Sequence, residues 1–256
     1  MSLTGRSISS WYKDLLEISN SNSGVDGTLR PIKSGEGTSS SLYVSTGKAK
    51  ILPAADSTTT LDVQDKDGNT KLLVDTTNDY VKALGHHVNT QYVNFGINYL
   101  ASLMSANTHY AIPFGSTDAT TSVSIGTGTN PDTSYTVSST AHTLSTTLWY
   151  VMDNITIDRV VWWHGADAAT GDTTRAHVMS YDIVSDNSST SGDLSNGTVL
   201  CDGADITNAG YEQIYYQQMT IQSANVDAGK AVFFCFRSDS VNSDFSINAQ
   251  IKVHMR

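Results

Sequence analysis

Asp65, Asp67 and Asn69 have the residue types and spacing that begin a calcium-binding loop of the EF-hand kind. Such a loop also needs a glycine at its sixth position and a bidentate Glu at its twelfth. This chain has Thr70 and Thr76 at those two positions. The segment therefore predicts a plain turn between two strands, without a metal ion.

The other residues that could support chemistry are scattered. His86 and His87 are adjacent, so three chains meeting on an axis there could surround a metal ion with imidazoles, although surface or packed histidines are the simpler expectation. Gly126 and Gly128 lack the third glycine of a dinucleotide loop, and the chain has no nucleophile elbow, P-loop or zinc-protease motif. A pair of turn aspartates acting as a glycosidase stays an open alternative. We expect no enzyme activity, no cofactor and no metal.

Trp162, Trp163 and His164 end the most apolar strand-like run of the sequence. Successive side chains of a strand point to opposite faces, so one tryptophan should be in the core and the other should face outward. An outward ring would lie either under a subunit contact or on a surface that binds glycans. Cys201 and Cys235 are 34 positions apart in no metal or redox pattern, which indicates buried free thiols.

The composition indicates the elements that position these residues. Serine and threonine make up 64 of the 256 residues, and only 3 of the 25 acidic residues are Glu, so strand and turn formers outnumber helix formers. We predict a mainly β protein. No apolar run approaches the ~20 residues of a membrane span, and the first residues do not resemble a signal peptide. No membrane insertion is expected.

The charge is unevenly distributed along the chain. Residues 1–82 contain 9 basic and 10 acidic residues, and residues 83–256 contain 6 and 15, which gives −1 and −9 and sums to the net charge of −10. A strongly acidic surface repels phosphate, so we expect no nucleic-acid partner. The two parts are expected to face different surroundings.

Residues 1–20 carry the clearest helical pattern of the chain. Ile8, Trp11, Leu15 and Ile18 are spaced by three, four and three residues, as along the contact seam of a short coiled coil. A helix of this length is marginal alone in water. The pattern predicts an N-terminal helix that packs on the same chain, on other copies or on a larger protein.

Three further segments follow. Residues 21–83, rich in Gly, Ser and Asn, are expected to form a thin β shaft whose hairpin pairs residues 61–64 with 71–74 around a turn at 66–69. Residues 84–110 are assigned to a connector of open conformation. Residues 111–256 alternate eight or nine short strands with polar turns, which predicts an antiparallel sandwich or jelly roll.

The N-terminal segments also resemble a known family. GlyArgSerIleSer (5–9), the run from Lys13 to Arg30 and GlyGluGlyThrSerSerSerLeu (35–42) are similar to the N-terminal parts of fibre-like structural proteins of tailed bacteriophages. The hairpin residues 61–69 and 72–81 resemble the short trimeric shaft module of such proteins. The resemblance implies a protein made in the host cytoplasm that trimerises and becomes part of the virion.

The end of the chain resembles a second feature of these proteins. Residues 227–239 and 247–254 are similar to the last strands of a jelly-roll head of the tumour-necrosis-factor-like type. The resemblance implies a homotrimer anchored to other virion proteins, in the tail or the capsid, through its N-terminal part. Its head would bind a host surface glycan or outer-membrane protein.

The expected function is therefore a trimeric tail fibre or spike that attaches the phage to its host. Two alternatives stay open at this stage. One is a capsid decoration protein or head fibre that stabilises the shell, and the other is a non-viral carbohydrate-binding module.

Overall fold

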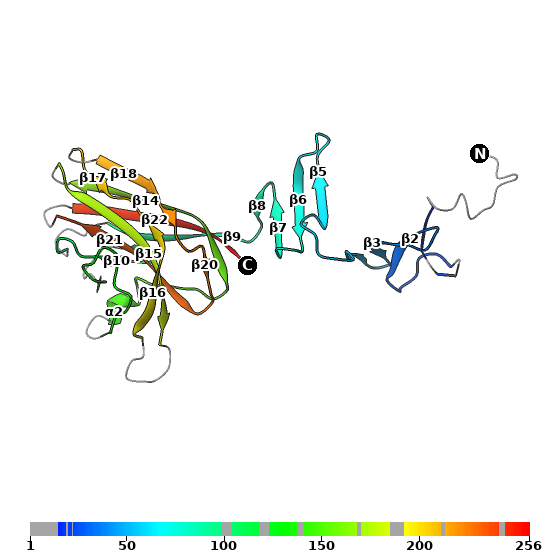
Figure 1. The fold of residues 1–256 in the computed structure, drawn as a ribbon, viewed down its shortest axis with the longest axis horizontal. Coiled ribbons are helices and arrows are strands. Elements are labelled where there is room, and N and C mark those ends of the chain that lie inside the picture. The colour runs from blue at the N-terminus through cyan, green and yellow to red at the C-terminus, as the bar shows by residue number, and fades with distance from the viewer. Residues whose placement is uncertain are drawn as a thin grey trace. The chain divides into compact units, whose positions relative to one another are not determined.

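The computed structural model describes residues 15–18, 20–21, 23–98, 104–117, 123–137, 141–167, 170–184, 192–210, 213–240 and 244–256. The chain divides into two compact units, Met1–Val88 and Asn89–Arg256. The described secondary structure is almost entirely strand, with one short helix, α2 (Ala141–Leu144) (Figure 1). The predicted mainly β class is confirmed.

The first unit contains two four-stranded antiparallel sheets, in each of which the strands follow one another in chain order. Short strands joined by turns pair with their sequence neighbours, as expected for a chain this rich in turn formers. One sheet comprises β1 (Leu16–Ile18), β2 (Arg30–Ser34), β3 (Ser39–Val44) and β4 (Ala49–Ile51). The other comprises β5 (Leu61–Gln64), β6 (Thr70–Asp75), β7 (Tyr80–Ala83) and β8 (His86–His87).

The predicted hairpin is present as β5 and β6, with Leu61 opposite Val74. Its turn has Gly68 at a φ of 80°, a left-handed conformation that glycine adopts without steric cost. Asp65 Oδ1 accepts hydrogen bonds from the backbone N–H groups of Asp67 and Asn69, both at 2.9 Å. The carboxylate therefore caps the predicted turn between the two strands.

The predicted N-terminal helix is wrong in the part that the structure describes. Residues 16–18 form the strand β1, in which Leu16 pairs with Ser34 and Ile18 with Ile32 of β2. Three turns of helix have little stability of their own, so backbone pairing with a neighbouring strand decides the conformation. Of the four seam residues, Ile8 and Trp11 lie outside the described residues.

The second unit is a sandwich of two larger sheets (Figure 1). One sheet has the order β12-β10-β21-β15-β16-β19, with β13 and β17 attached beside β21 and β15. Its strands are β10 (Tyr110–Ile112), β12 (Val123–Ser124), β13 (Trp149–Tyr150), β15 (Thr173–Ile183), β16 (Leu194–Asp202), β17 (Ile206–Thr207), β19 (Thr220–Ile221) and β21 (Lys230–Ser238).

The other sheet has the order β11-β9-β22-β14-β18, with β20 attached beside β14. All of its pairs are antiparallel except that of β11 with β9. Its strands are β9 (Thr90–Ile97), β11 (Gly115–Thr117), β14 (Ile155–Asp167), β18 (Gln213–Gln218), β20 (Asn225–Val226) and β22 (Asp244–Met255).

The core of the second unit lies between these two sheets. Phe95, Trp162 and Ile251 from one sheet and Val178 and Phe234 from the other belong to one cluster of buried side chains. A second cluster covers the opposite side of the β21 sheet, where Leu144 of α2 packs with Met179 and Phe233. Each sheet thus buries its apolar residues against another layer, as a sandwich requires.

Residues 90–97 differ from the predicted connector at 84–110. They form β9, which pairs along its whole length with the C-terminal strand β22, from Thr90 opposite His254 to Ile97 opposite Ile247. Val93, Phe95 and Ile97 point inward at the two-residue period of a strand and are buried. The second unit therefore begins at Asn89 rather than at residue 111.

Both cysteines are buried and free, as predicted. Burial disfavours the thiolate and raises the pKa of Cys201 to about 12, and it also raises the pKa of Cys235. The two thiols are therefore core side chains with little nucleophilic character.

Candidate functional site

The described residues of the first unit form almost no core. Asp75 is the only buried residue among those described. The Asp75 carboxylate accepts hydrogen bonds from the backbone N–H groups of Thr77 and Asn78, so it stabilises the adjacent turn. Every described apolar side chain of this unit is exposed or only half-buried. The large exposed ones are Leu15, Leu16, Val25, Leu42, Ile51, Leu52, Val63, Leu84 and Val88.

The described part of the predicted N-terminal seam follows this pattern. Leu15 is exposed and Ile18 is half-buried. The two residues are an odd number of positions apart, so extended backbone directs their side chains to opposite faces. The seam expected from helical spacing is therefore not a single face in residues 15–18.

An apolar cleft of about 420 Å³ lies in the first unit. Side chains of β3 and β4 line it together with side chains of β5 and β6. We refer to it as the first-unit cleft, and its lining residues are Leu42, Ala49, Lys50, Ile51, Thr60, Leu61, Val74 and Thr76. Open apolar surface of this kind is stabilised when another chain covers it.

The paired histidines His86 and His87 form β8 at the edge of the second small sheet. His86 is exposed, and the ring of His87 makes an edge-to-face contact with Tyr80 at 5.0 Å between centroids. Whether copies meet at this pair stays a prediction of the sequence.

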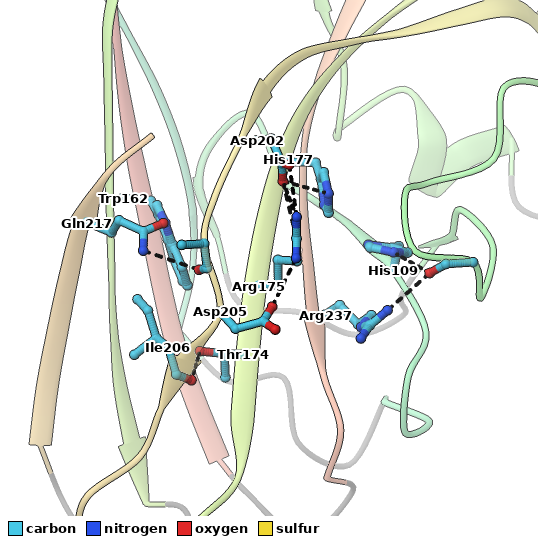
Figure 2. A network of polar contacts seen from close by, with 12 residues as sticks. His109, Trp162, Thr174, Arg175, His177, Asp202, Asp205, Ile206, Gln217 and Arg237 are labelled. Carbon is cyan, nitrogen blue, oxygen red and sulfur yellow. Dashed lines mark hydrogen bonds and ion pairs between the residues drawn. The ribbon is translucent and has the colours of Figure 1, made fainter. Parts of the chain in front are cut away.

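The second unit contains a polar network around Arg175 of β15 (Figure 2). Arg175 donates from Nε and Nη2 to Asp202 of β16 at 2.9–3.2 Å, and from Nη1 to Asp205 at 3.2 Å. A guanidinium that donates two parallel bonds to one carboxylate is a strong and well-oriented pair. The contacts join β15 to β16 and to the loop that follows β16.

Two imidazoles lie beside this ion pair. His109 and His177 are fully buried, and their rings meet edge to face with centroids 5.0 Å apart (Figure 2). His177 Nε2 lies 3.1 Å from Asp202 Oδ1 without forming a hydrogen bond. Burial lowers the pKa of both histidines, that of His177 to about 4. At neutral pH both rings are uncharged.

The glycine segment 126–128 has a structural part in the same network. Gly126 adopts a φ of 88°, and the carbonyl of Gly128 lies 3.1 Å from His109 Nε2 and accepts a hydrogen bond from Arg237 Nη1 at 3.1 Å. Since both imidazoles are completely buried, a substrate cannot reach them. The geometry supports a clamp that holds this loop and three strands together.

The sequence prediction for the two tryptophans is confirmed. Trp162 is fully buried, and its ring stacks on His164, which in turn stacks on Tyr215. Trp163 faces outward with 36% of its surface exposed. Burial lowers the pKa of His164 to about 4, so the central ring of this stack is neutral at pH 7.

Two exposed residues beside Trp163 escaped the sequence analysis. Trp163 lies directly opposite Tyr216 of β18, and Gly165, two positions further along β14, lies opposite Ile214. Tyr216 is 74% and Ile214 80% exposed. Residues 214, 216 and 218 share one face of a strand, but the segment QIYYQQ does not alternate apolar and polar residues, so the sequence does not indicate which face is exposed.

No protein-family model matches this chain, and a search of curated protein sequences finds no match. The described residues contain no helix with the length and apolar character of a membrane span.

Proposed function

We propose that this chain is a structural protein of a tailed-bacteriophage virion, namely a homotrimeric tail fibre or spike that attaches the particle to its host. The observation that carries the proposal is the contrast between the two units. Among its described residues, the first unit has eight strands and no buried apolar side chain, whereas the second has a sandwich core.

A unit without a core needs other chains for its stability. Withdrawing apolar surface from water contributes about 25 cal/mol per Å², and one copy of the first unit leaves residues such as Leu42, Ile51 and Val63 exposed. Copies wound around an axis would cover these side chains and the first-unit cleft. The near-neutral charge of residues 1–82 allows such copies to approach closely.

The second unit suits a terminal head. It holds its own core, carries 15 acidic and 6 basic residues and presents exposed aromatic side chains. We assign it to a jelly roll of the tumour-necrosis-factor-like type, on the resemblance of the segments that contain β21 and the end of β22. The resemblance of residues 5–42 to phage proteins supports a virion location for the whole chain, with the N-terminal part as the anchor.

Electron microscopy of intact phage particles, labelled with gold-tagged antibody against residues 111–256, tests this function. We expect gold at the tail, with antibody against the major capsid protein as the control for labelling of the shell. Gold distributed over the capsid would favour the alternative of a decoration protein or head fibre. Particles that contain no antigen would refute a virion role and favour the non-viral carbohydrate-binding module.

A further inference from the structure

The outer surface of the β9-β22-β14-β18 sheet combines aromatic and amide side chains. Trp163 and Tyr216 lie directly opposite each other on β14 and β18. Ile214 is two positions before Tyr216 on β18 and lies on the same face. Side chains at directly opposed positions are roughly 5 Å apart and form one continuous surface. We call this surface the sheet face.

Amide side chains continue the sheet face next to the rings. Gln218, Gln250 and Asn94 occupy one row across the sheet, since Val161 pairs with both Gln218 and Gln250, and Gln250 pairs with Asn94. Gln250 Nε2 donates to Asn94 Oδ1 at 3.2 Å, which orients both groups. Asn248 lies beside Trp163 in the next row. Each amide offers donors and an acceptor together, which is the pattern needed to bind neighbouring hydroxyl groups.

The charge of the sheet face differs from that of the unit around it. The second unit has 15 acidic and 6 basic residues. From Arg159 to Gly165 and at the positions opposite them, none of the described outward side chains is a carboxylate. Arg159 and Lys252, which pair with each other, provide two of the six cations. This part of an acidic unit therefore accepts neutral or anionic groups without repulsion.

The inner side of the edge strand holds the rings in place. Gln217 accepts a hydrogen bond from Trp162 Nε1 at 3.4 Å and donates to the carbonyl of Ala204 at 3.2 Å (Figure 2). Tyr215 stacks on His164, and its hydroxyl accepts the backbone N–H of Ala209 at 2.8 Å. These contacts fix β18 on its inner side, so Tyr216 is presented from a rigid strand, which lowers the entropic cost of binding.

Gly165 leaves an open place in the sheet face next to Trp163 and Ile214. A Cβ atom built on this glycine would meet no atom within 4 Å, and its backbone is not in the left-handed region. A larger side chain at this position would therefore fit the fold while projecting over the sheet face.

We propose that the sheet face binds an oligosaccharide. Sugar rings present C–H faces that stack on aromatic rings and hydroxyl edges that pair with amides, which matches Trp163 and Tyr216 beside the row of amides. The large exposed apolar and aromatic side chains are Trp163, Tyr216 and Ile214 at one corner and Tyr92 opposite Lys252. The row of amides separates the corner from Tyr92, so the sheet face lacks the continuous apolar centre of a subunit interface. The proposal rests on the proposed function, for which it names the class of host ligand.

Binding of the full-length protein to a printed array of bacterial O-antigen and capsular polysaccharides, neutral and acidic, tests this proposal. We expect binding to at least one array glycan, and a loss of about tenfold or more in affinity for Tyr216→Ala, as for a central aromatic contact. Gly165→Val should weaken binding to a similar extent without removing any side chain. Thr198→Ala, an exposed position on the other sheet, is the matched control and should bind normally.

The outcomes separate this proposal from the proposed function. Absence of binding to every array glycan, or equal binding by wild type, Tyr216→Ala and Gly165→Val, would overturn the carbohydrate site. If these two variants change the solution mass of the assembly instead, the sheet face is a contact between copies and the site is likewise refuted. Folding of each variant is checked by its thermal unfolding, and a trimeric mass in the absence of glycan binding would leave the fibre proposal standing.

Discussion

Replacing Ile51 by Asp should weaken the assembly of the chain while leaving the second unit folded. Ile51 lines the first-unit cleft, and 41% of its surface is exposed in a single copy. Full burial of an isoleucine side chain contributes about 1.5–3 kcal/mol, so covering this remaining fraction contributes about 0.6–1.2 kcal/mol per chain. A trimer would lose about 2–4 kcal/mol, to which the desolvation of three carboxylates adds.

Analytical ultracentrifugation over a dilution series measures this effect. A loss of about 2–4 kcal/mol corresponds to a roughly 30- to 700-fold larger dissociation constant of the trimer. Ser40→Asp adds the same charge at an exposed polar position of β3 and is the matched control, for which we expect little change. If Ile51→Asp dissociates at the same concentration as wild type, the first-unit cleft is not covered by another copy and the reasoning fails.

Three further predictions concern the second unit. Since burial lowers the pKa of His164 from 6.5 to about 4, the unfolded state binds its proton first as the pH falls, and the stability held at pH 7 is lost between pH 6.5 and 4. Because of this histidine, the free energy of unfolding should fall by about 2 kcal/mol when the pH is lowered from 7 to 5. Urea titrations at the two pH values should show a smaller decrease for His164→Phe. If the variant has the same pH dependence as wild type, His164 is not buried in its neutral form. Asp202→Ala leaves Arg175 with one carboxylate partner and should lower the free energy of unfolding by about 1–3 kcal/mol. Asp205 has a side chain that is 54% exposed, so Asp205→Ala should lower it by less than about 1 kcal/mol. Equal losses for the two variants in denaturant titrations would argue against the clamp. Cys201 and Cys235 should react with a thiol reagent only at the rate of unfolding, and fast labelling of the native protein would show that their burial is incomplete.

Local patterns predicted the parts of the fold that depend on local pairing. The turn at residues 66–69 carries the polar and glycine residues of a tight hairpin. The alternation at Trp162 and Trp163 predicts that one ring is buried and the other faces outward, and the structure shows that Trp162 is the buried one. Most of the strands of the second unit were also recognisable, because their apolar residues repeat at a period of two.

Long-range pairing decided the parts that the sequence analysis missed. Residues 90–97, assigned to a connector of open conformation, become a strand because each of them pairs with a residue of β22 that lies 150 to 164 positions further along the chain. The same applies to residues 16–18, whose partner is β2. A pattern within one segment does not contain the identity of its partner.

The candidate sites depended on the fold in a similar way. Arg175, Asp202 and His109 come from distant parts of the chain, and no spacing in the sequence predicts that they meet. Tyr216 lies in the part of the chain predicted to form short strands, but its exposure follows from the outward face of β18 at the edge of the sheet. Register and edge position are properties of the assembled sheet.

The solution mass of the intact chain tests the central claim most directly. The described residues of the first unit form no apolar core in a single copy, so we predict a mass of about three times 27.5 kDa by light scattering on a sizing column at micromolar concentration. Ile51→Asp and Ser40→Asp, measured in parallel, would link that mass to the first unit. A mass of 27.5 kDa would contradict the predicted trimer. If amide hydrogen exchange also showed a protected, cooperatively folded first unit in this monomer, that unit would be stable without any partner chain.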